Sequence, residues 1–171
     1  MLVESLVCSP TPSYPYHIAA KRYSARYDSD TTKQRYSESD NELTLIFLHS
    51  TSFHKEIWEP TIEGLLQGQD RWRTRIREVY AIDCPNHGVA AVLNDGLLRD
   101  FAGMMKSRIP RTGRGTDGIF LDRGAFLVAG TKLFAECAMQ FLLSGPTLNT
   151  PVDFSKRNLV GIGHSAGGVA V

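Results

Sequence analysis

Residues 163–167 read Gly163-His164-Ser165-Ala166-Gly167 and match the pattern G-x-S-x-G. In this pattern a strand turns at once into a helix, and the serine at the apex takes a strained backbone conformation that exposes its hydroxyl. The glycines on either side are needed because a side chain there would clash across the turn. An apolar run precedes the motif at 159–162, and small residues follow it at 166–170. The stretch therefore predicts a buried strand, a nucleophilic Ser165 and the start of a helix.

Two further motifs each follow an apolar run. The run 43–48 leads into His49-Ser50-Thr51, and the run 78–82 leads into Asp83-Cys84-Pro85-Asn86-His87-Gly88, which resembles a D-x-P-x-H-G turn. In a fold that uses a G-x-S-x-G serine, the loop after an earlier strand supplies one backbone N–H to the oxyanion hole, and the residue after the serine supplies another. One such donor lowers a barrier by about 3–4 kcal/mol.

The three motifs, in this order, resemble those of the α/β-hydrolases, and in particular the fungal branch of toxin-biosynthesis-like and peroxisomal-lipase-like proteins. That branch carries the segment H-A-x-G-F-H-K-E-x-W-E-P, and this chain matches it at His49, Phe53, His54, Lys55, Glu56, Trp58, Glu59 and Pro60. Ser50 and Ser52 stand where the branch usually has alanine and glycine, and a serine at 52 narrows backbone freedom in the loop. The resemblance runs from the first strand to Val171 and covers roughly the N-terminal half of the family's fold.

The resemblance implies a serine hydrolase that acts on an ester, thioester or related acyl bond of a small-molecule substrate. Ser165 is then the nucleophile, and the backbone N–H groups of Ala166 and Thr51 form the oxyanion hole. The resemblance implies neither a cofactor nor a metal. The histidines at 49, 54, 87 and 164 fit no common zinc spacing.

The acid and the histidine of this family follow the serine in sequence, and the chain continues for only 171 − 165 = 6 residues past Ser165. We therefore expect residues 1–171 to form a truncated α/β-hydrolase domain that lacks both groups and is inactive alone. One alternative is a non-catalytic fragment or pseudogene product. Another is a dinucleotide-binding unit, because Gly161-x-Gly163-x-x-Ala166 fits the fingerprint G-x-G-x-x-G/A.

Apolar runs alternate with helical patterns along the chain, which predicts a mostly parallel sheet with helices on both faces. The family's strand order would begin 1-2-4-3-5. We expect strands at 2–7, 17–27, 43–48, 78–82 and 158–163, helices at 55–67 and 123–143, and loops at 28–42 and 107–118. The apolar side of the first helix is predicted to comprise Ile57, Trp58, Ile62, Leu65 and Leu66.

The composition indicates an ordinary globular protein rather than a binder of polyanions. The net charge of +1 gives no electrostatic case for nucleic acid. No apolar run reaches the roughly 18 residues of a membrane span, and the N-terminus lacks the basic flank of a signal peptide. Three widely spaced cysteines favour reduced thiols. We expect a cytoplasmic or peroxisomal protein. A C-terminal targeting signal cannot be read from this sequence, and the sequence does not determine the oligomeric state.

Overall fold

The computed structural model describes residues 1–25, 42–68, 75–100, 118–144 and 152–171, and within the long helix at 118–144 it describes the side chains of 130–143. The loop predicted at 28–42 lies almost entirely outside these residues, as does the loop predicted at 107–118. The proline-rich segment between the first two strands contains a tight reversal in which Thr11 and Tyr14 pair through their backbones.

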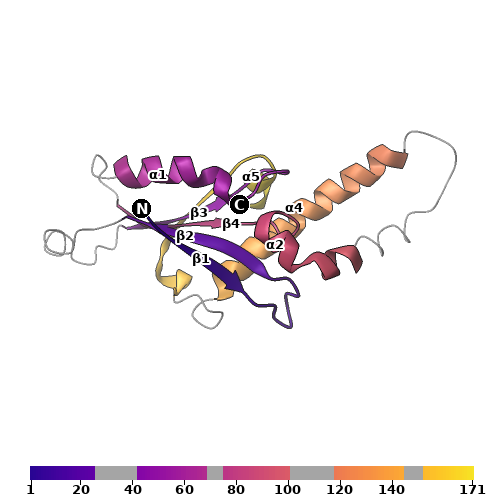
Figure 1. Cartoon of the computed structure of the whole chain (residues 1–171), viewed down its shortest axis with the longest axis horizontal. Helices are drawn as coiled ribbons and strands as arrows, with labels where there is room; N and C mark the ends of the chain where they lie inside the picture. Colours follow the sequence, from indigo (N-terminus) through magenta and orange to yellow (C-terminus); the bar gives the residue numbers. More distant parts are fainter. Residues whose placement is uncertain (26–41, 69–74, 101–117, 145–151) are drawn as a thin grey trace, which may run out of the picture.

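Five strands form one sheet in the order β1-β2-β4-β3-β5, the order that the resemblance predicts (Figure 1). The strands are β1 (Leu2–Cys8), β2 (Ile18–Ser24), β3 (Leu43–Leu48), β4 (Ile76–Ile82) and β5 (Asn158–Gly163). Strand β2 runs antiparallel to both β1 and β4, whereas β3 runs parallel to both β4 and β5. Four strands thus share one direction, and only β2 opposes them.

The register brings the carboxyl ends of the three parallel strands level with one another. Leu48, the last residue of β3, pairs with Ile82 at the end of β4 and with Gly163 at the end of β5. The segments after these strands therefore meet at one edge of the sheet. Ligands of open α/β sheets bind outside the carboxyl ends of the strands.

One face of the sheet is covered by η1 (Lys55–Trp58) and α1 (Glu59–Gly68). Ile62 and Leu66 are buried there, and the ring of Trp58 packs edge-on against Phe47 with centroids 4.8 Å apart. The prediction for Ile57 was wrong, because this side chain is 48% exposed. The segment begins as a 3₁₀ helix, whose three residues per turn rotate Ile57 away from the apolar side of the α-helix that follows.

The other face is covered by α4 (Gly118–Ser144) together with the short η4 (Phe154–Lys156). Phe134, Cys137 and Phe141 are buried there, and Phe141 packs edge-on against Tyr80 of β4 with ring centroids 5.5 Å apart. Helices therefore cover both faces, as predicted.

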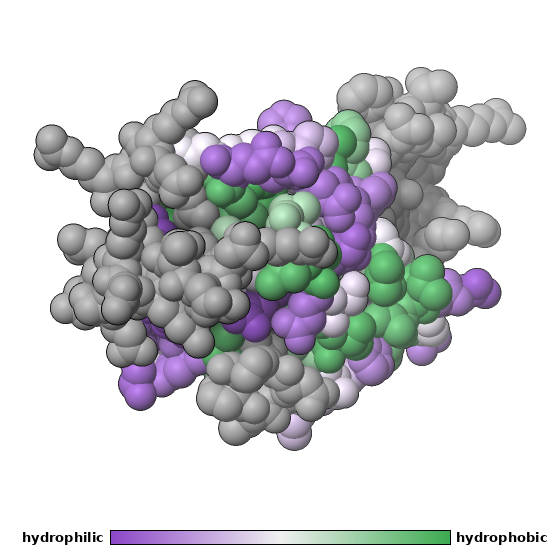
Figure 2. Space-filling view, turned by 60° about the vertical axis from the view of Figure 1, so that its left-hand side comes forward, coloured by the Kyte–Doolittle hydropathy of each residue, from purple (hydrophilic) through white to green (hydrophobic). Residues whose placement is uncertain are grey.

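The remaining helices lie at the carboxyl edge of the sheet. They are α2 (Gly88–Leu93), a helical segment at 95–100, and α5 (Ala166–Ala170), which contacts α4 and β3 as well as β5. Outside the grey atoms, both hydrophilic and apolar side chains appear on the face drawn in Figure 2. Within the described ranges, no helix has the length and apolar character needed to cross a membrane.

Candidate active site

Ser165 lies at the apex of a sharp turn between β5 and α5. Its backbone has φ 53° and ψ −114°, a left-handed conformation that is uncommon for a residue with a side chain. The turn is tied to the neighbouring strand, because the N–H of His164 donates to the carbonyl oxygen of Leu48 at 3.2 Å. The Ser165 side chain is exposed. The strand, the turn and the following helix thus stand where the sequence predicts them.

Two glycines permit this turn because the backbones on either side of it nearly touch. A Cβ atom added at Gly163 would lie 2.2 Å from the carbonyl oxygen of Gly167. A Cβ atom added at Gly167 would lie 2.2 Å from the carbonyl oxygen of Leu48. Both distances are far shorter than any real contact of a Cβ atom, so the steric reason for glycine that the sequence predicts holds at both positions.

The segment after β3 forms a tight turn at Ser50–Phe53. The N–H of Phe53 donates to the carbonyl oxygen of Ser50 at 3.2 Å, and Ser52 has φ 69°. Thr51 therefore stands at the exposed corner of a turn whose third residue occupies the left-handed region. The usual glycine of the related segment would adopt this conformation without strain.

A small cavity joins the turn after β3 to the turn after β5. Its volume is about 50 Å³, and it is lined by His49, Ser50, Thr51, Cys84, Asn86, His87, Gly130, Thr131 and Ala166. Thr51 and Ala166, predicted as the oxyanion donors, thus line the same cavity. Among the residues that the structure describes, neither backbone N–H has a hydrogen-bond partner, so both are available to a bound group.

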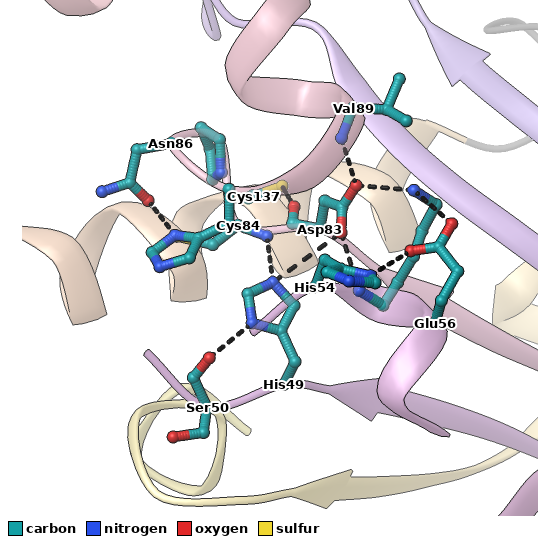
Figure 3. Close-up of polar contacts among 12 residues, drawn as sticks. His49, Ser50, His54, Glu56, Asp83, Cys84, Asn86, Val89 and Cys137 are labelled. Carbon is teal, nitrogen blue, oxygen red and sulfur yellow. Dashed lines mark hydrogen bonds and ion pairs between the residues drawn. The ribbon is translucent and has the colours of Figure 1, made fainter. Parts of the chain in front are cut away.

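His49 connects the ends of β3 and β4 through both ring nitrogens (Figure 3). Its Nε2 accepts the backbone N–H of Cys84 at 3.0 Å, so Nδ1 carries the proton and donates to the carbonyl oxygen of Ser50 at 2.8 Å. The ring is 1% exposed. Burial lowers the pKa of His49, and the hydrogen bond to Ser50 opposes that shift. The imidazole is therefore neutral and serves as a structural bridge beside the cavity.

Asp83, at the end of β4, is fully buried and accepts three hydrogen bonds. The backbone N–H of Lys55 donates to Oδ1 at 2.8 Å, while the Lys55 ammonium donates to Oδ2 at 2.6 Å and the N–H of Val89 donates to Oδ2 at 3.0 Å (Figure 3). Gly88 has φ 54°, and a Cβ atom there would lie 2.4 Å from Oδ2. The D-x-P-x-H-G turn therefore has glycine at its last position so that the backbone can close around this carboxylate.

The charged part of the segment 54–59 forms a partly buried ion-pair cluster at η1. Glu56 accepts from the His54 ring at 2.7 Å and forms ion pairs with Lys55 at 3.1 Å and Lys21 at 3.2 Å. Burial alone would raise the pKa of Glu56, but these hydrogen bonds, that from His54 foremost, lower it to about 2. Sequence reasoning missed this structural role, although opposite charges next to one another in the segment 54–59 were a usable signal.

The remaining titratable groups of the site do not act on Ser165 in this structure. All five histidines of the chain are described, and none hydrogen-bonds to the Ser165 hydroxyl. Burial raises the pKa of the Cys84 thiol to about 12, so the thiol stays protonated and serves as packing. In the described part of the chain, no cluster of three or more His, Cys, Asp or Glu side chains is arranged to hold a metal ion.

The dinucleotide alternative gains no support from the geometry. That fingerprint places its first glycine in the tight turn between strand and helix. Here Gly161 lies inside β5, paired with Ile46 of β3. A Cβ atom at Gly161 would lie 2.3 Å from a side-chain methyl of Val171, so close packing against that side chain accounts for this glycine.

No protein-family model matches the chain. A curated protein of Saccharomyces cerevisiae, the peroxisomal membrane protein LPX1, is 30% identical over 152 residues, which cover 88% of this chain and 32% of that protein. The solved structure of the peroxisomal alpha-beta-hydrolase Lpx1 from the same yeast superposes with a TM-score of 0.56 at 21% identity, covering 98% of this chain and 38% of that one.

The two similarities point to the same relative. The structural likeness shows the fold, and the sequence likeness extends over most of this chain, which spans about a third of the length of the curated protein. The chain is therefore similar to the peroxisomal-lipase-like α/β-hydrolases, and its described residues have the fold of part of an α/β-hydrolase.

Proposed function

We propose that this chain carries the nucleophile and the oxyanion hole of a serine hydrolase that cleaves an ester, thioester or related acyl bond of a small molecule. The observation that carries the proposal is the strained backbone of Ser165, which has φ 53°. The next residue, Ala166, lines the same cavity as Thr51. Strained backbone conformations cluster at active sites, where the surrounding structure maintains them.

The chemistry assigns one role to each of these groups. The Ser165 oxygen attacks the acyl carbonyl carbon while a general base removes the hydroxyl proton. The negative oxygen of the tetrahedral intermediate accepts hydrogen bonds from the N–H groups of Thr51 and Ala166. The intermediate collapses to an acyl-enzyme and expels the protonated leaving group. Water then releases the acid and restores the serine. The base and its orienting carboxylate come from residues other than those described here.

The description of yeast Lpx1 as an alpha-beta-hydrolase supports this proposal.

Yeast Lpx1 is also described as peroxisomal. We propose the same location for this chain, with the cytoplasm as the alternative. Fluorescence microscopy of the protein tagged at its N-terminus, beside a peroxisomal marker, distinguishes the two.

A second candidate is a protein that is not catalytic by itself. The specific observation in its favour is that none of the five histidines hydrogen-bonds to Ser165. Without a base, a serine hydroxyl is a weak nucleophile. On this reading the 171-residue chain hydrolyses p-nitrophenyl acetate no faster than its Ser165→Ala variant.

A chimera tests the proposal. Residues 1–171 are fused to the part of yeast Lpx1 that this chain does not cover, and the product is treated with a fluorophosphonate probe. We expect labelling that Ser165→Ala abolishes and that Ser9→Ala, a change at another exposed serine, leaves intact. A folded chimera that the probe does not label would contradict the proposed function and favour the non-catalytic alternative.

A further inference from the structure

The turn after β3 contains a residue in a conformation that its side chain disfavours. Ser52 has φ 69° and is the third residue of the turn closed by Phe53 N–H and the Ser50 carbonyl oxygen. Turns of this kind favour glycine at that position because the left-handed region crowds a Cβ atom. A serine there needs a compensating contact. Within the turn, the Phe53 N–H bonds to the Ser50 carbonyl oxygen and the Ser50 hydroxyl donates to the Thr51 carbonyl oxygen at 3.4 Å, and neither bond involves Ser52.

The compensating contact comes from His87, which is 35 residues away in the sequence. The backbone N–H of Ser52 donates to His87 Nε2 at 3.0 Å. Because a backbone N–H can only donate, Nε2 carries no proton, and the protonated Nδ1 donates to the Asn86 side-chain oxygen at 2.7 Å (Figure 3). Asn86 thereby fixes both the tautomer and the orientation of the ring that receives Ser52.

We propose that His87 is a positioning residue that holds the Ser50–Phe53 turn in the conformation in which Thr51 faces the cavity. His87 itself lines that cavity with Thr51 and Ala166. The catalytic meaning of this role rests on the proposed function, since it assigns the Thr51 N–H to the oxyanion hole. His87 takes no part in proton transfer to or from Ser165, because both of its nitrogens are occupied by Ser52 and Asn86.

The contact depends on the charge of His87. A proton on Nε2 would point at the Ser52 N–H, and two donors cannot bond to each other. Burial lowers the pKa of His87 below its usual 6.5, while the carboxylate of Asp83 opposes that shift. The other titratable groups beside the ring are His49, whose ring centroid is 5.2 Å away, and the Cys84 thiol. The ring is therefore neutral at pH 7, and the turn loosens in acid.

Nuclear magnetic resonance on the 171-residue chain tests the contact without any catalysis. We expect the Nδ1–H tautomer for His87, and an amide shift of Ser52 that titrates with the ring at a pH below 6.5. Loss of one hydrogen bond corresponds to about a threefold to tenfold faster amide exchange. His87→Ala should accelerate exchange of the Ser52 N–H by that factor, and His87→Gln, which retains an acceptor, should restore part of the protection.

A double variant separates positioning from general destabilisation. In the double variant His87→Ala with Ser52→Gly, the glycine adopts positive φ without help from His87. The Phe53 N–H, which closes the turn and should lose protection in His87→Ala alone, should therefore regain its protection from exchange. The amide of residue 52 should stay unprotected. A variant that has merely lost stability would show neither pattern. An Nε2–H tautomer, or Ser52 exchange that is unchanged by His87→Ala, would overturn the proposal.

The chimera with yeast Lpx1 then connects the contact to the chemistry. Fluorophosphonate labelling of Ser165 should slow with His87→Ala and recover with the added Ser52→Gly. If the unaltered chimera is not labelled, the proposed function fails, and the exchange data still decide whether His87 holds the turn. If labelling occurs and ignores His87→Ala, the positioning role fails and the hydrolase remains.

Discussion

Replacing Gly167 with alanine tests whether the turn at Ser165 is built as the structure indicates. The added Cβ atom would lie 2.2 Å from the carbonyl oxygen of Leu48 and 2.7 Å from that of His49. Both atoms belong to backbone at the end of β3, which cannot rotate away as a flexible side chain would. The Leu48 oxygen also accepts the N–H of His164, so its displacement would disturb the turn itself.

The expected cost follows from this geometry. Overpacking that forces a backbone shift costs about 1–3 kcal/mol, and the better helix propensity of alanine offsets at most about 1 kcal/mol of it. With backbone on both sides of the clash, we expect a net loss of about 2 kcal/mol. For a chain of this size, that lowers the melting temperature by roughly 4–8 °C.

Gly168→Ala is the matched control in the same short helix. Its Cβ atom would meet nothing nearer than the Gly163 carbonyl oxygen at 3.4 Å, which is an ordinary contact. Stability should therefore stay equal or rise slightly. Urea unfolding followed by circular dichroism measures both free energies of unfolding. Equal losses in the two variants, or no loss in Gly167→Ala, would refute the close approach of α5 to β3.

Three further predictions concern groups outside this turn. Lys55→Met leaves the buried carboxylate of Asp83 without its cation and should lower the free energy of unfolding, measured by urea titration, by about 3–5 kcal/mol. Lys132→Met removes an exposed ion pair and should change that free energy by under about 1 kcal/mol. Because the pKa of Glu56 falls from 4.5 to about 2 on folding, its stabilising effect is complete above pH 4.5 and is lost as the pH falls toward 2, so a Glu56→Gln variant should show a flatter stability profile over that interval. All three cysteines are buried thiols, so Ellman's reagent should react slowly with the native chain and quickly in denaturant; fast labelling before unfolding would contradict this packing.

The sequence predicts the central strands well and the charged strand poorly. Strand β3 and strand β5 occupy the predicted residues, because each is an uncharged run bounded by polar residues. Strand β4 begins at Ile76, two residues before the prediction, and includes Arg77 and Glu78. Glu78 is 1% exposed because Arg22 on the adjacent β2 neutralises it at 2.8 Å. A partner on another strand cannot be identified from local pattern, so neither the burial of Glu78 nor the extension of the strand to Ile76 was predicted.

The candidate site shows the same division. The motif alone predicts Ser165 as the nucleophile, and the resemblance predicts Thr51 and Ala166 as the oxyanion donors, because these roles attach to fixed positions in a short pattern. The contacts that shape the site join residues far apart in sequence. Lys55 and Asp83 are 28 residues apart, and Ser52 and His87 are 35 apart. Only the parallel register of β3 and β4 brings them together, and no local spacing encodes that register.

These long-range contacts explain why the turn after β3 keeps one conformation although it contains no glycine or proline. The chain is anchored before the turn, where the buried His49 bonds to Ser50 and Cys84, and after it, where the backbone N–H of Lys55 bonds to Asp83. Between the two anchors, the His87 bond fixes the residue that has positive φ. All three supports end on the segment that follows β4. The D-x-P-x-H-G motif therefore supports the turn after β3 through these hydrogen bonds. A substitution in that motif should change the shape of the cavity even though the substituted residue contacts no substrate.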